Sequence, residues 1–263
     1  MQYGMVIDMN RCVGCHACAI ACKAEWEVPV DQGRNWVRRL GPAQTPNGLA
    51  YTYYVGLCNH CDNPTCVPVC PVRPVEKTFT EAKTGKTKTM MVAATWKDPF
   101  NGTVQVDKDR CIGCGACARA CPYGARYVHA WPGTDGGVDR KVDKCTYCVP
   151  RLEKGLEPAC VQTCLAKARI FGDLTDPKSE VAQYVKKGAV GLTSAAVQIG
   201  PNSRYLGNKK DMALLMTQTP TTMPQVSSRR LVLSQMVEPF KREFDSLGLA
   251  GLLATTEDDG RKG

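Results

Sequence analysis

The chain has 263 residues, of which 16 are cysteine, 24 glycine and 17 proline, while only 7% are aromatic. A core built mainly from packed apolar side chains would use more large hydrophobic residues, so something besides hydrophobic burial helps to hold this chain. The formal net charge of +9 suggests an acidic partner, but the sequence has no aromatic and basic platform for nucleic acid. It also lacks a glycine-rich phosphate loop and a triad, so no catalysis is expected on this chain.

The N-terminal residues and the apolar runs bear on export and membrane insertion. Residues 1–8 show neither the basic start and apolar stretch of a secretory signal nor a twin-arginine pair. No apolar run approaches the roughly 18 to 20 residues that cross a bilayer. We therefore expect no export signal and no transmembrane segment on this chain, and any membrane contact would go through a partner.

A short strand is predicted at residues 5–8, and it leads into the first of four cysteine groups. The first and third groups are spaced C-x2-C-x2-C-x3-C, the second C-x2-C-x4-C-x3-C and the fourth C-x2-C-x11-C-x3-C, with no cysteine left over. In chain order the groups are Cys12, Cys15, Cys18 and Cys22; Cys58, Cys61, Cys66 and Cys70; Cys111, Cys114, Cys117 and Cys121; and Cys145, Cys148, Cys160 and Cys164.

Three kinds of bonding compete for these cysteines. Disulfides suit small secreted domains, and cysteines separated by two residues rarely reach disulfide geometry inside a tight turn. Zinc uses two C-x2-C pairs, whereas here three cysteines arrive within seven residues. The run C-x2-C-x2-C-x3-C-P is the bacterial ferredoxin signature, and it is complete at Cys121-Pro122. Iron–sulfur clusters are therefore the favoured interpretation.

Small residues beside the ligands support this interpretation. Gly14 and Gly113 lie between the first two cysteines of their groups, where the backbone must turn closely around inorganic sulfide. A positive φ is accessible there at low cost only to glycine. Together with Pro122, these glycines are the predicted cofactor-binding residues other than the cysteines.

An internal repeat relates the first and third cysteine groups. A shift of 99 residues superimposes residues 7–22 on residues 106–121, which indicates a duplicated ferredoxin-like unit. Each copy is predicted to have a short strand, at 5–8 and at 103–107, and a helical turn after the fourth cysteine. The predicted fold class is α+β: a duplicated bacterial-type 2[4Fe-4S] ferredoxin-like fold with insertions and a long C-terminal extension.

The remaining segments are an insertion and an extension. Residues 71–103 form an insertion whose residues 77–92 are predicted as an exposed hairpin around Thr84-Gly85-Lys86; it is either a solvated insertion or an arm that grips a partner. Residues 166–174 are expected to return to the sheet and 178–187 to form a helix. The four-cluster domain would span residues 1–175. Residues 176–263 would be an extension that docks on partner subunits, and its residues 227–247 carry an apolar stripe at near-helical spacing.

The order and spacing of the four cysteine groups resemble those of the four-cluster electron-transfer subunits of the dimethyl-sulfoxide reductase family of molybdoenzymes. Polysulfide, tetrathionate and arsenate reductases are close relatives in that family, and the resemblance covers about residues 3–175. It implies that the first group pairs with the fourth and the second with the third. The clusters would then be held by Cys12, Cys15, Cys18 and Cys164; by Cys145, Cys148, Cys160 and Cys22; by Cys58, Cys61, Cys66 and Cys121; and by Cys111, Cys114, Cys117 and Cys70.

Differences from the family pattern indicate which branch of the family this chain resembles. Nitrate-reductase-like members replace one cysteine of the second group by tryptophan and hold a three-iron cluster, whereas this chain has cysteine at every position, which implies four [4Fe-4S] clusters. Formate-dehydrogenase-like members end in a membrane-spanning helix, which this sequence lacks. After Cys70 the chain continues P-V-R-P, where the family usually has P-T-G-A.

The resemblance implies an electron relay. The chain would carry single electrons between a molybdenum or tungsten bis-pterin catalytic subunit and an integral-membrane quinone-reactive subunit or cytochrome in an anaerobic respiratory oxidoreductase. One alternative is a subunit of a hydrogenase or another quinone-linked complex without molybdenum or tungsten, and another is a structural or sensing role for the clusters. Because partners in this family often carry a twin-arginine signal, we expect the periplasmic face of the cytoplasmic membrane, with the cytoplasmic face as the alternative.

Charge near the ligands is expected to matter, because positive charge favours the reduced state of a cluster. His16 and His60 lie inside ligand groups and could donate to a sulfide. The basic residues near the ligands in sequence are Arg11, Lys23, Arg110, Arg119, Arg126, Lys144 and Arg151.

The cofactors also change the meaning of the net charge. An oxidised [4Fe-4S] cluster with four thiolates carries about −2, so four of them would offset most of the +9. Because the clusters would replace the missing apolar core, the iron-free chain is expected to be largely unfolded over residues 1–175.

Overall fold

The computed structural model describes residues 1–81, 84–132, 138–193 and 198–218. All sixteen cysteines lie in these ranges, and none of them forms a disulfide. The described residues belong to one compact unit. The apolar stripe predicted at residues 227–247 lies outside the described residues.

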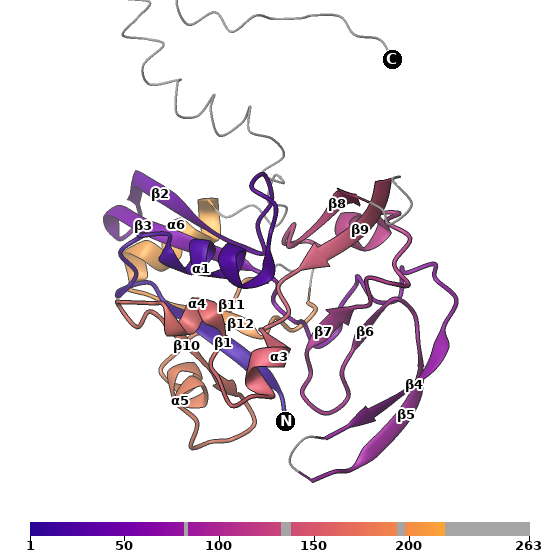
Figure 1. Cartoon of the computed structure of the whole chain (residues 1–263). Coiled ribbons are helices and arrows are strands. Elements are labelled where there is room, and N and C mark those ends of the chain that lie inside the picture. The colour runs from indigo at the N-terminus through magenta and orange to yellow at the C-terminus, as the bar shows by residue number, and fades with distance from the viewer. Residues whose placement is uncertain (82–83, 133–137, 194–197, 219–263) are drawn as a thin grey trace, which may run out of the picture. The chain divides into compact units, whose positions relative to one another are not determined.

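A four-stranded sheet has the first strand of the chain in its interior. β1 is antiparallel to β10 and parallel to β12 (Figure 1). Val6 of β1 packs with Ile170 on one face, while Met5 and Ile7 belong to the larger core on the other. The strand predicted at 5–8 and the return to the sheet predicted at 166–174 are therefore confirmed. The sheet has the order β10-β1-β12-β11, with β1 (Tyr3–Asp8), β10 (Arg169–Asp173), β11 (Val190–Gly191) and β12 (Ser203–Leu206).

The other strands of the described residues pair in two-stranded sheets. The hairpin predicted at 77–92 is confirmed as β4–β5, with Gly85 near its turn at a φ of 71°. The strand predicted at 103–107 is confirmed as β7. The pairs are β2 (Asn35–Thr45) with β3 (Gly48–Leu57), β4 (Val75–Thr80) with β5 (Thr87–Val92), β6 (Thr95–Lys97) with β7 (Val104–Val106), and β8 (Arg126–Pro132) with β9 (Val138–Lys144).

The helices are short, and among the described residues none has the length and apolarity that crossing a bilayer requires. The helix predicted at 178–187 is confirmed as α5, which Ser179 caps by accepting a hydrogen bond from the Ala182 N–H at 3.2 Å. The helices are α1 (Ala17–Trp26), α2 (Ala116–Arg119), α3 (Val149–Leu152), α4 (Ala159–Gln162), α5 (Glu180–Lys186) and α6 (Lys209–Gln218).

The helical turn predicted after the fourth cysteine is confirmed in the first repeat, where α1 continues from Cys22 to Trp26, and is wrong in the second, where a non-helical turn follows Cys121. α1 begins before Cys18 and contains Cys22, and α2 begins before Cys117 and ends before Cys121. Both helices thus begin one residue before the third cysteine, at Ala17 and Ala116. In α1 the C-x3-C spacing places Cys18 and Cys22 on one face, because residues four apart on a helix lie on the same side.

The segment after residue 176 contributes strongly to the core. β12 pairs with β1, and α6, which the sequence did not predict, packs on β2 and β3. Leu214 and Leu215 of α6 are buried there. Residues as far as 218 thus help to support the cysteine-bearing elements, and docking of the extension on partner subunits stays a prediction.

Candidate metal centres

Four thiols from distant parts of the sequence line one cavity, which we call site I. Cys12 and Cys15 come from the segment that joins β1 to α1, Cys18 lies in the first turn of α1, and Cys164 comes from the turn after α4. The Ala168 N–H, just before β10, donates to Cys164 Sγ at 3.3 Å. The pairing of β1 with β10 therefore brings the first and last cysteines of the chain together.

A second cavity, site II, is lined by Cys22, Cys145, Cys148 and Cys160. Cys22 lies on α1 one turn after Cys18 of site I, so this helix supplies a thiol to each of two sites. Three hydrogen bonds reach site II sulfurs: from Trp26 Nε1 to Cys148 at 3.3 Å, from Tyr147 N to Cys145 at 3.4 Å and from Arg169 Nη1 to Cys160 at 3.1 Å.

The remaining eight cysteines form two further sets. Site III consists of Cys58, Cys61, Cys66 and Cys121. Burial raises the pKa of Cys61, and the three neighbouring thiols Cys58, Cys121 and Cys66 raise it further. Site IV is a cavity lined by Cys70, Cys111, Cys114 and Cys117. The structure thus brings together each of the four ligand sets that the resemblance implies.

The contacts between neighbouring ligand loops give the four sites the order I, II, III, IV. Cys18 of site I and Cys22 of site II share α1, the site II and site III loops meet where Tyr147 stacks on His60, and Cys117 of site IV is four residues from Cys121 of site III. Burial is the largest cause of a raised pKa at Cys160, Cys145 and Cys66. A thiol of a neighbouring site then raises each pKa further, namely Cys18 for Cys160, Cys58 for Cys145 and Cys117 for Cys66. Neighbouring sites are therefore close enough for their charges to interact.

The residues present suit iron–sulfur clusters. In the described ranges no three Cys, His, Asp or Glu side chains lie close enough to bind one metal ion, whereas a zinc tetrahedron needs thiolates about 2.3 Å from a single centre. Arg169 Nε and His60 Nε2 are buried without a protein partner. Donors of this kind suit the sulfides of a cluster, which accept hydrogen bonds.

The predicted glycines have the expected backbone conformation. Gly14 and Gly113 have φ values of 67° and 66°. A Cβ at Gly14 would lie 2.2 Å from the Tyr53 ring, and one at Gly113 would lie 2.2 Å from the Arg140 carbonyl oxygen. These glycines therefore allow close approach of other parts of the chain as well as a tight ligand loop.

Pro122 lies in a turn directly after Cys121. Burial and then Cys58 raise the pKa of Cys121 to about 11, and the backbone N–H groups of Ala125 and Tyr123 oppose this rise by hydrogen-bonding the thiol. The turn at Pro122 therefore directs backbone donors at a ligand sulfur.

Of the basic residues predicted near the ligands, Arg126 and Lys144 are buried, each with 1% exposure. Lys144 Nζ donates to the carbonyls of Val104 and Cys145, the latter at 2.7 Å. The others are not buried. Arg11 and Arg119 are exposed, while Lys23, Arg110 and Arg151 are half-buried and donate to carbonyls elsewhere in the chain.

The two histidines differ. His16 is exposed and has a φ of 60° before α1. His60 is fully buried and stacks on Tyr147 with ring centroids 3.8 Å apart, and its Nδ1 accepts a hydrogen bond from the Val104 N–H at 2.9 Å. Burial and then the charges of Lys144 and Arg126 hold the pKa of His60 well below its usual value, so the ring is neutral. Since His60 belongs to the site III loop and Tyr147 to the site II loop, their stack joins these two sites.

Two buried arginines, Arg34 and Arg169, were missed by the sequence reasoning; each is 4% exposed. For Arg169 a signal exists, because Cys121 and Cys164 are both followed by x3-Ala-Arg. For Arg34, in the loop before β2, the sequence offers no comparable signal.

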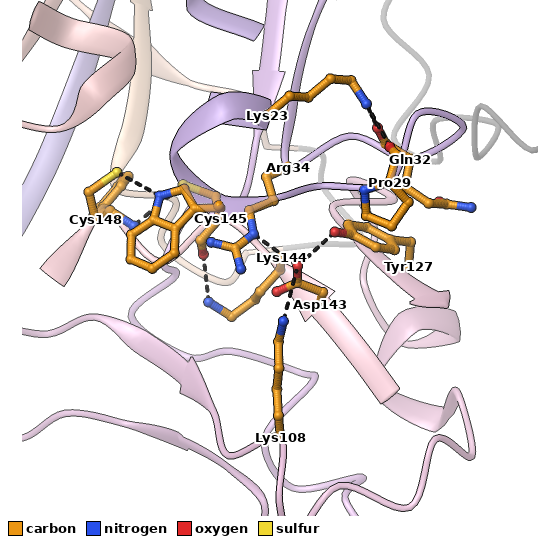
Figure 2. A network of polar contacts seen from close by, with 12 residues as sticks. Lys23, Pro29, Gln32, Arg34, Lys108, Tyr127, Asp143, Lys144, Cys145 and Cys148 are labelled. Carbon is orange, nitrogen blue, oxygen red and sulfur yellow. Dashed lines mark hydrogen bonds and ion pairs between the residues drawn. The ribbon is translucent and has the colours of Figure 1, made fainter. Parts of the chain in front are cut away.

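A buried ion pair links the segment before β2 to β9. Figure 2 shows Arg34, Tyr127 and Lys108 pointing at the carboxylate of Asp143. The Oδ2 atom of Asp143 accepts hydrogen bonds from Arg34 Nε at 2.9 Å and from the Tyr127 hydroxyl at 2.7 Å. The Arg34 guanidinium also lies 4.7 Å from the centroid of the Trp26 ring, whose N–H donates to a site II thiol. This network therefore supports a ligand of site II.

Comparison with known proteins agrees with this geometry. Residues 49–174 match the family described as 4Fe-4S dicluster domain. A tetrathionate reductase subunit of Salmonella typhimurium is 38% identical over 213 residues, which cover 78% of this chain and 72% of that protein. A polysulfide reductase subunit of Wolinella succinogenes is 40% identical over 182 residues, 68% of this chain and 81% of that protein. The arsenate respiratory reductase iron–sulfur subunit of a Shewanella species is 35% identical over 248 residues, 78% of this chain and 96% of that protein.

These relatives confirm the resemblance drawn from the cysteine pattern. The number and spacing of the sixteen cysteines and the match to the dicluster family both agree with a protein that carries four [4Fe-4S] clusters. The chain therefore belongs to the 4Fe-4S dicluster family, as a non-catalytic iron–sulfur electron-transfer subunit of the kind found in respiratory reductase complexes.

Proposed function

We propose that this chain conducts single electrons through clusters held at sites I to IV, between a molybdenum or tungsten bis-pterin catalytic subunit and an integral-membrane quinone-reactive subunit or cytochrome. The observation that carries the proposal is the convergence of sixteen cysteines on four adjacent groups of four. A [4Fe-4S] cluster supplies the one-electron chemistry. The chain holds the ligands, keeps water from the inner sites and sets the charge around them.

The ligand sets proposed for the four clusters are the thiols of sites I, II, III and IV. Sites I and II draw on the first and fourth cysteine groups, and sites III and IV on the second and third. Each pair is then one ferredoxin-like unit in which the fourth cysteine of one group completes the cluster of the other. This exchange supports a duplicated 2[4Fe-4S] arrangement.

The exposure of the cysteines supports electron entry and exit at the two ends of the row. Sites I and IV each have one exposed cysteine, Cys15 and Cys114, whereas sites II and III have none. Beside them Val13 is 56% exposed and Ile112 63% exposed. Apolar side chains at an accessible cluster suit a protein partner. We therefore assign the partner contacts to these two ends.

We assign electron transfer between the two pairs of sites to the contact between sites II and III. Tyr147 and His60 stack there at 3.8 Å, and the Tyr147 hydroxyl is hydrogen-bonded to the Ser203 hydroxyl at 2.7 Å. Because all three side chains are buried, this contact excludes water and fixes the separation of the two inner sites.

We further propose that the complex faces the periplasm and that the chain is exported with its catalytic partner. The resemblance to a family whose catalytic subunits often carry twin-arginine signals supports this location. Protease treatment of spheroplasts should then degrade the subunit, whereas protection until lysis would support the cytoplasmic face.

Purification of the native complex followed by metal analysis tests the proposed partners. We expect molybdenum or tungsten together with iron in the active complex, and reduction of the clusters when the catalytic partner receives electrons. An active complex without either metal would favour a hydrogenase-type or other quinone-linked assembly. Clusters that cannot be reduced in an EPR titration would favour a structural role.

A further inference from the structure

Each pair of sites contains one buried arginine at an equivalent position. Arg169 begins β10 and Arg126 begins β8. Both end the same sequence pattern, Cys-x3-Cys-x3-Ala-Arg, which starts at Cys160 in one case and at Cys117 in the other. The first cysteine of the pattern belongs to site II or IV, and the second belongs to site I or III. The pattern therefore places each arginine next to both sites of its own pair.

Arg169 lies between sites I and II. Its side chain lines the cavity of site I, while its Nη1 donates to Cys160 Sγ of site II at 3.1 Å. Its Nη2 donates to Asn35 Oδ1 at 3.2 Å, and Asn35 Nδ2 donates to the carbonyl of Cys18 in site I, also at 3.2 Å. One guanidinium and one amide thus connect a ligand of site I to a ligand of site II.

Arg126 occupies the corresponding place between sites III and IV. Burial raises the pKa of the Cys117 thiol of site IV, and the positive charge of Arg126 is the largest influence that opposes this rise. Its Nη2 donates to Thr95 Oγ1 at 2.9 Å, and Thr95 lines site IV. On its other side, Cys66 and Cys58 of site III stabilise its positive charge.

The charge of Arg169 is balanced by no carboxylate of the described residues. Among the residues that the structure describes, the ion pairs do not include Arg169, although its side chain is buried. Burial alone would lower its pKa, but Cys160 and then Cys18 outweigh this and raise it. A buried cation is stable only beside compensating negative charge, so the ligands of sites I and II are its counter-charge.

We propose that these two arginines set the reduction potentials of the clusters pair by pair, Arg169 for sites I and II and Arg126 for sites III and IV. Each places a permanent positive charge between two anionic clusters, because a guanidinium does not lose its proton in a protein. The reduced form of a cluster carries one more negative charge than the oxidised form. The arginine therefore stabilises the reduced form and raises the midpoint potential of its own pair. The inference rests on the proposed four-cluster assignment.

The test is a potentiometric EPR titration of the purified complex carrying Arg169→Gln or Arg126→Gln. We expect Arg169→Gln to lower the reduction equilibrium constants at sites I and II about tenfold, which is a drop of about 59 mV in midpoint potential for one electron. The midpoint potentials of sites III and IV should stay unchanged. Arg126→Gln should do the reverse. The exposed Arg11 adjoins Cys12 of site I, so Arg11→Gln is the matched control and should leave all four potentials unchanged.

Two further variants keep the test decisive if the glutamine variants fail to load clusters. Arg169→Lys keeps the positive charge, so the midpoint potentials at sites I and II should stay close to those of the unsubstituted complex. Asn35→Asp leaves Arg169 in place but puts a carboxylate beside its guanidinium. This negative charge should lower the midpoint potentials at sites I and II alone.

Unchanged potentials in Asn35→Asp, or equal shifts at all four sites in either glutamine variant, would overturn the inference. Failure of the underlying four-cluster assignment would look different, because the unsubstituted complex would then lack four reducible clusters.

Discussion

Cys160 and Cys164 lie close together in the sequence but contribute to different sites. Cys160 is on α4 and accepts a hydrogen bond from Arg169 at site II, whereas Cys164 follows the helix and accepts one from the Ala168 N–H at site I. We predict that Cys164→Ser weakens or removes the cluster at site I, because a serine oxygen replaces the thiolate that a [4Fe-4S] cluster requires. Iron analysis and EPR of the purified variant measure this loss.

The matched control for that prediction is Cys160→Ser, which should damage the cluster at site II and spare site I. If Cys164→Ser instead removes the site II cluster selectively, the exchange of fourth cysteines between groups is wrong.

Asp143 is the carboxylate of the buried network shown in Figure 2, and its removal would leave Arg34 buried without a counter-charge. We predict that Asp143→Asn destabilises the loaded protein by about 3 to 5 kcal/mol, measured as a lower denaturant midpoint under anaerobic conditions. Lys108 also approaches Asp143, at 3.6 Å, but its side chain is 44% exposed. The control Lys108→Met should therefore cost less than about 1 kcal/mol, and equal costs for the two variants would contradict this account.

The sign of the pH dependence at Asp143 follows from its partners. Burial raises the pKa of this carboxyl, but Arg34 and the Tyr127 hydroxyl outweigh burial, so the pKa lies below its ordinary value of 3.8. The stabilisation from Asp143 is thus present above pH 3.8 and is lost as the pH falls through the lower value of the folded state.

At the scale of single residues, the sequence could reveal the cysteines but few of the groups around them. Cluster ligands must follow narrow spacings, so the grouping is visible directly in the chain. Arg34 directly precedes, and Asn35 begins, a hairpin that the sequence did not reveal, and their burial depends on the tertiary contacts of this segment with α1 and β9. For that reason no local pattern could identify them.

Among the elements, those next to the cysteines were the predictable ones. β1, β7 and β10 could be predicted because each adjoins a ligand loop of the repeat, and α5 because it has a serine cap and ends before Gly188. The β2–β3 hairpin was missed although Pro46-Asn47 separates two strands, which is a recognisable turn signal. β12 and α6 were missed because their partners, β1 and the β2–β3 hairpin, lie far away in the sequence.

The packing of α6 on the β2–β3 hairpin leads to a prediction for this helix. Leu215 has 0% exposure, whereas the adjacent Met216 is 52% exposed. Leu215→Ala should destabilise the loaded protein by about 2 to 5 kcal/mol, because it leaves a cavity in the core. Met216→Ala is the matched control and should have little effect on the denaturant midpoint. A Leu215→Ala variant as stable as Met216→Ala would show that residues after 176 do not support the cluster domain.

For the whole molecule, the clusters explain both the low aromatic content and the basic charge. Among the described residues, cysteines belong to the two larger buried groups of apolar side chains, where they pack with residues such as Tyr147 and Val142. We therefore predict that removing iron unfolds residues 1–175, seen as lost circular dichroism and rapid proteolysis. A compact, protease-resistant apo form would contradict this prediction.

The most direct test of the electron relay is an iron and sulfide analysis of the anaerobically purified chain, combined with a potentiometric EPR titration. The account predicts iron and sulfide in the amounts of four [4Fe-4S] clusters for the sixteen cysteines, each reduced by one electron, with magnetic interaction between neighbours in the order I to IV. Zinc in place of iron, fewer clusters, or clusters that stay oxidised over the whole potential range would contradict it.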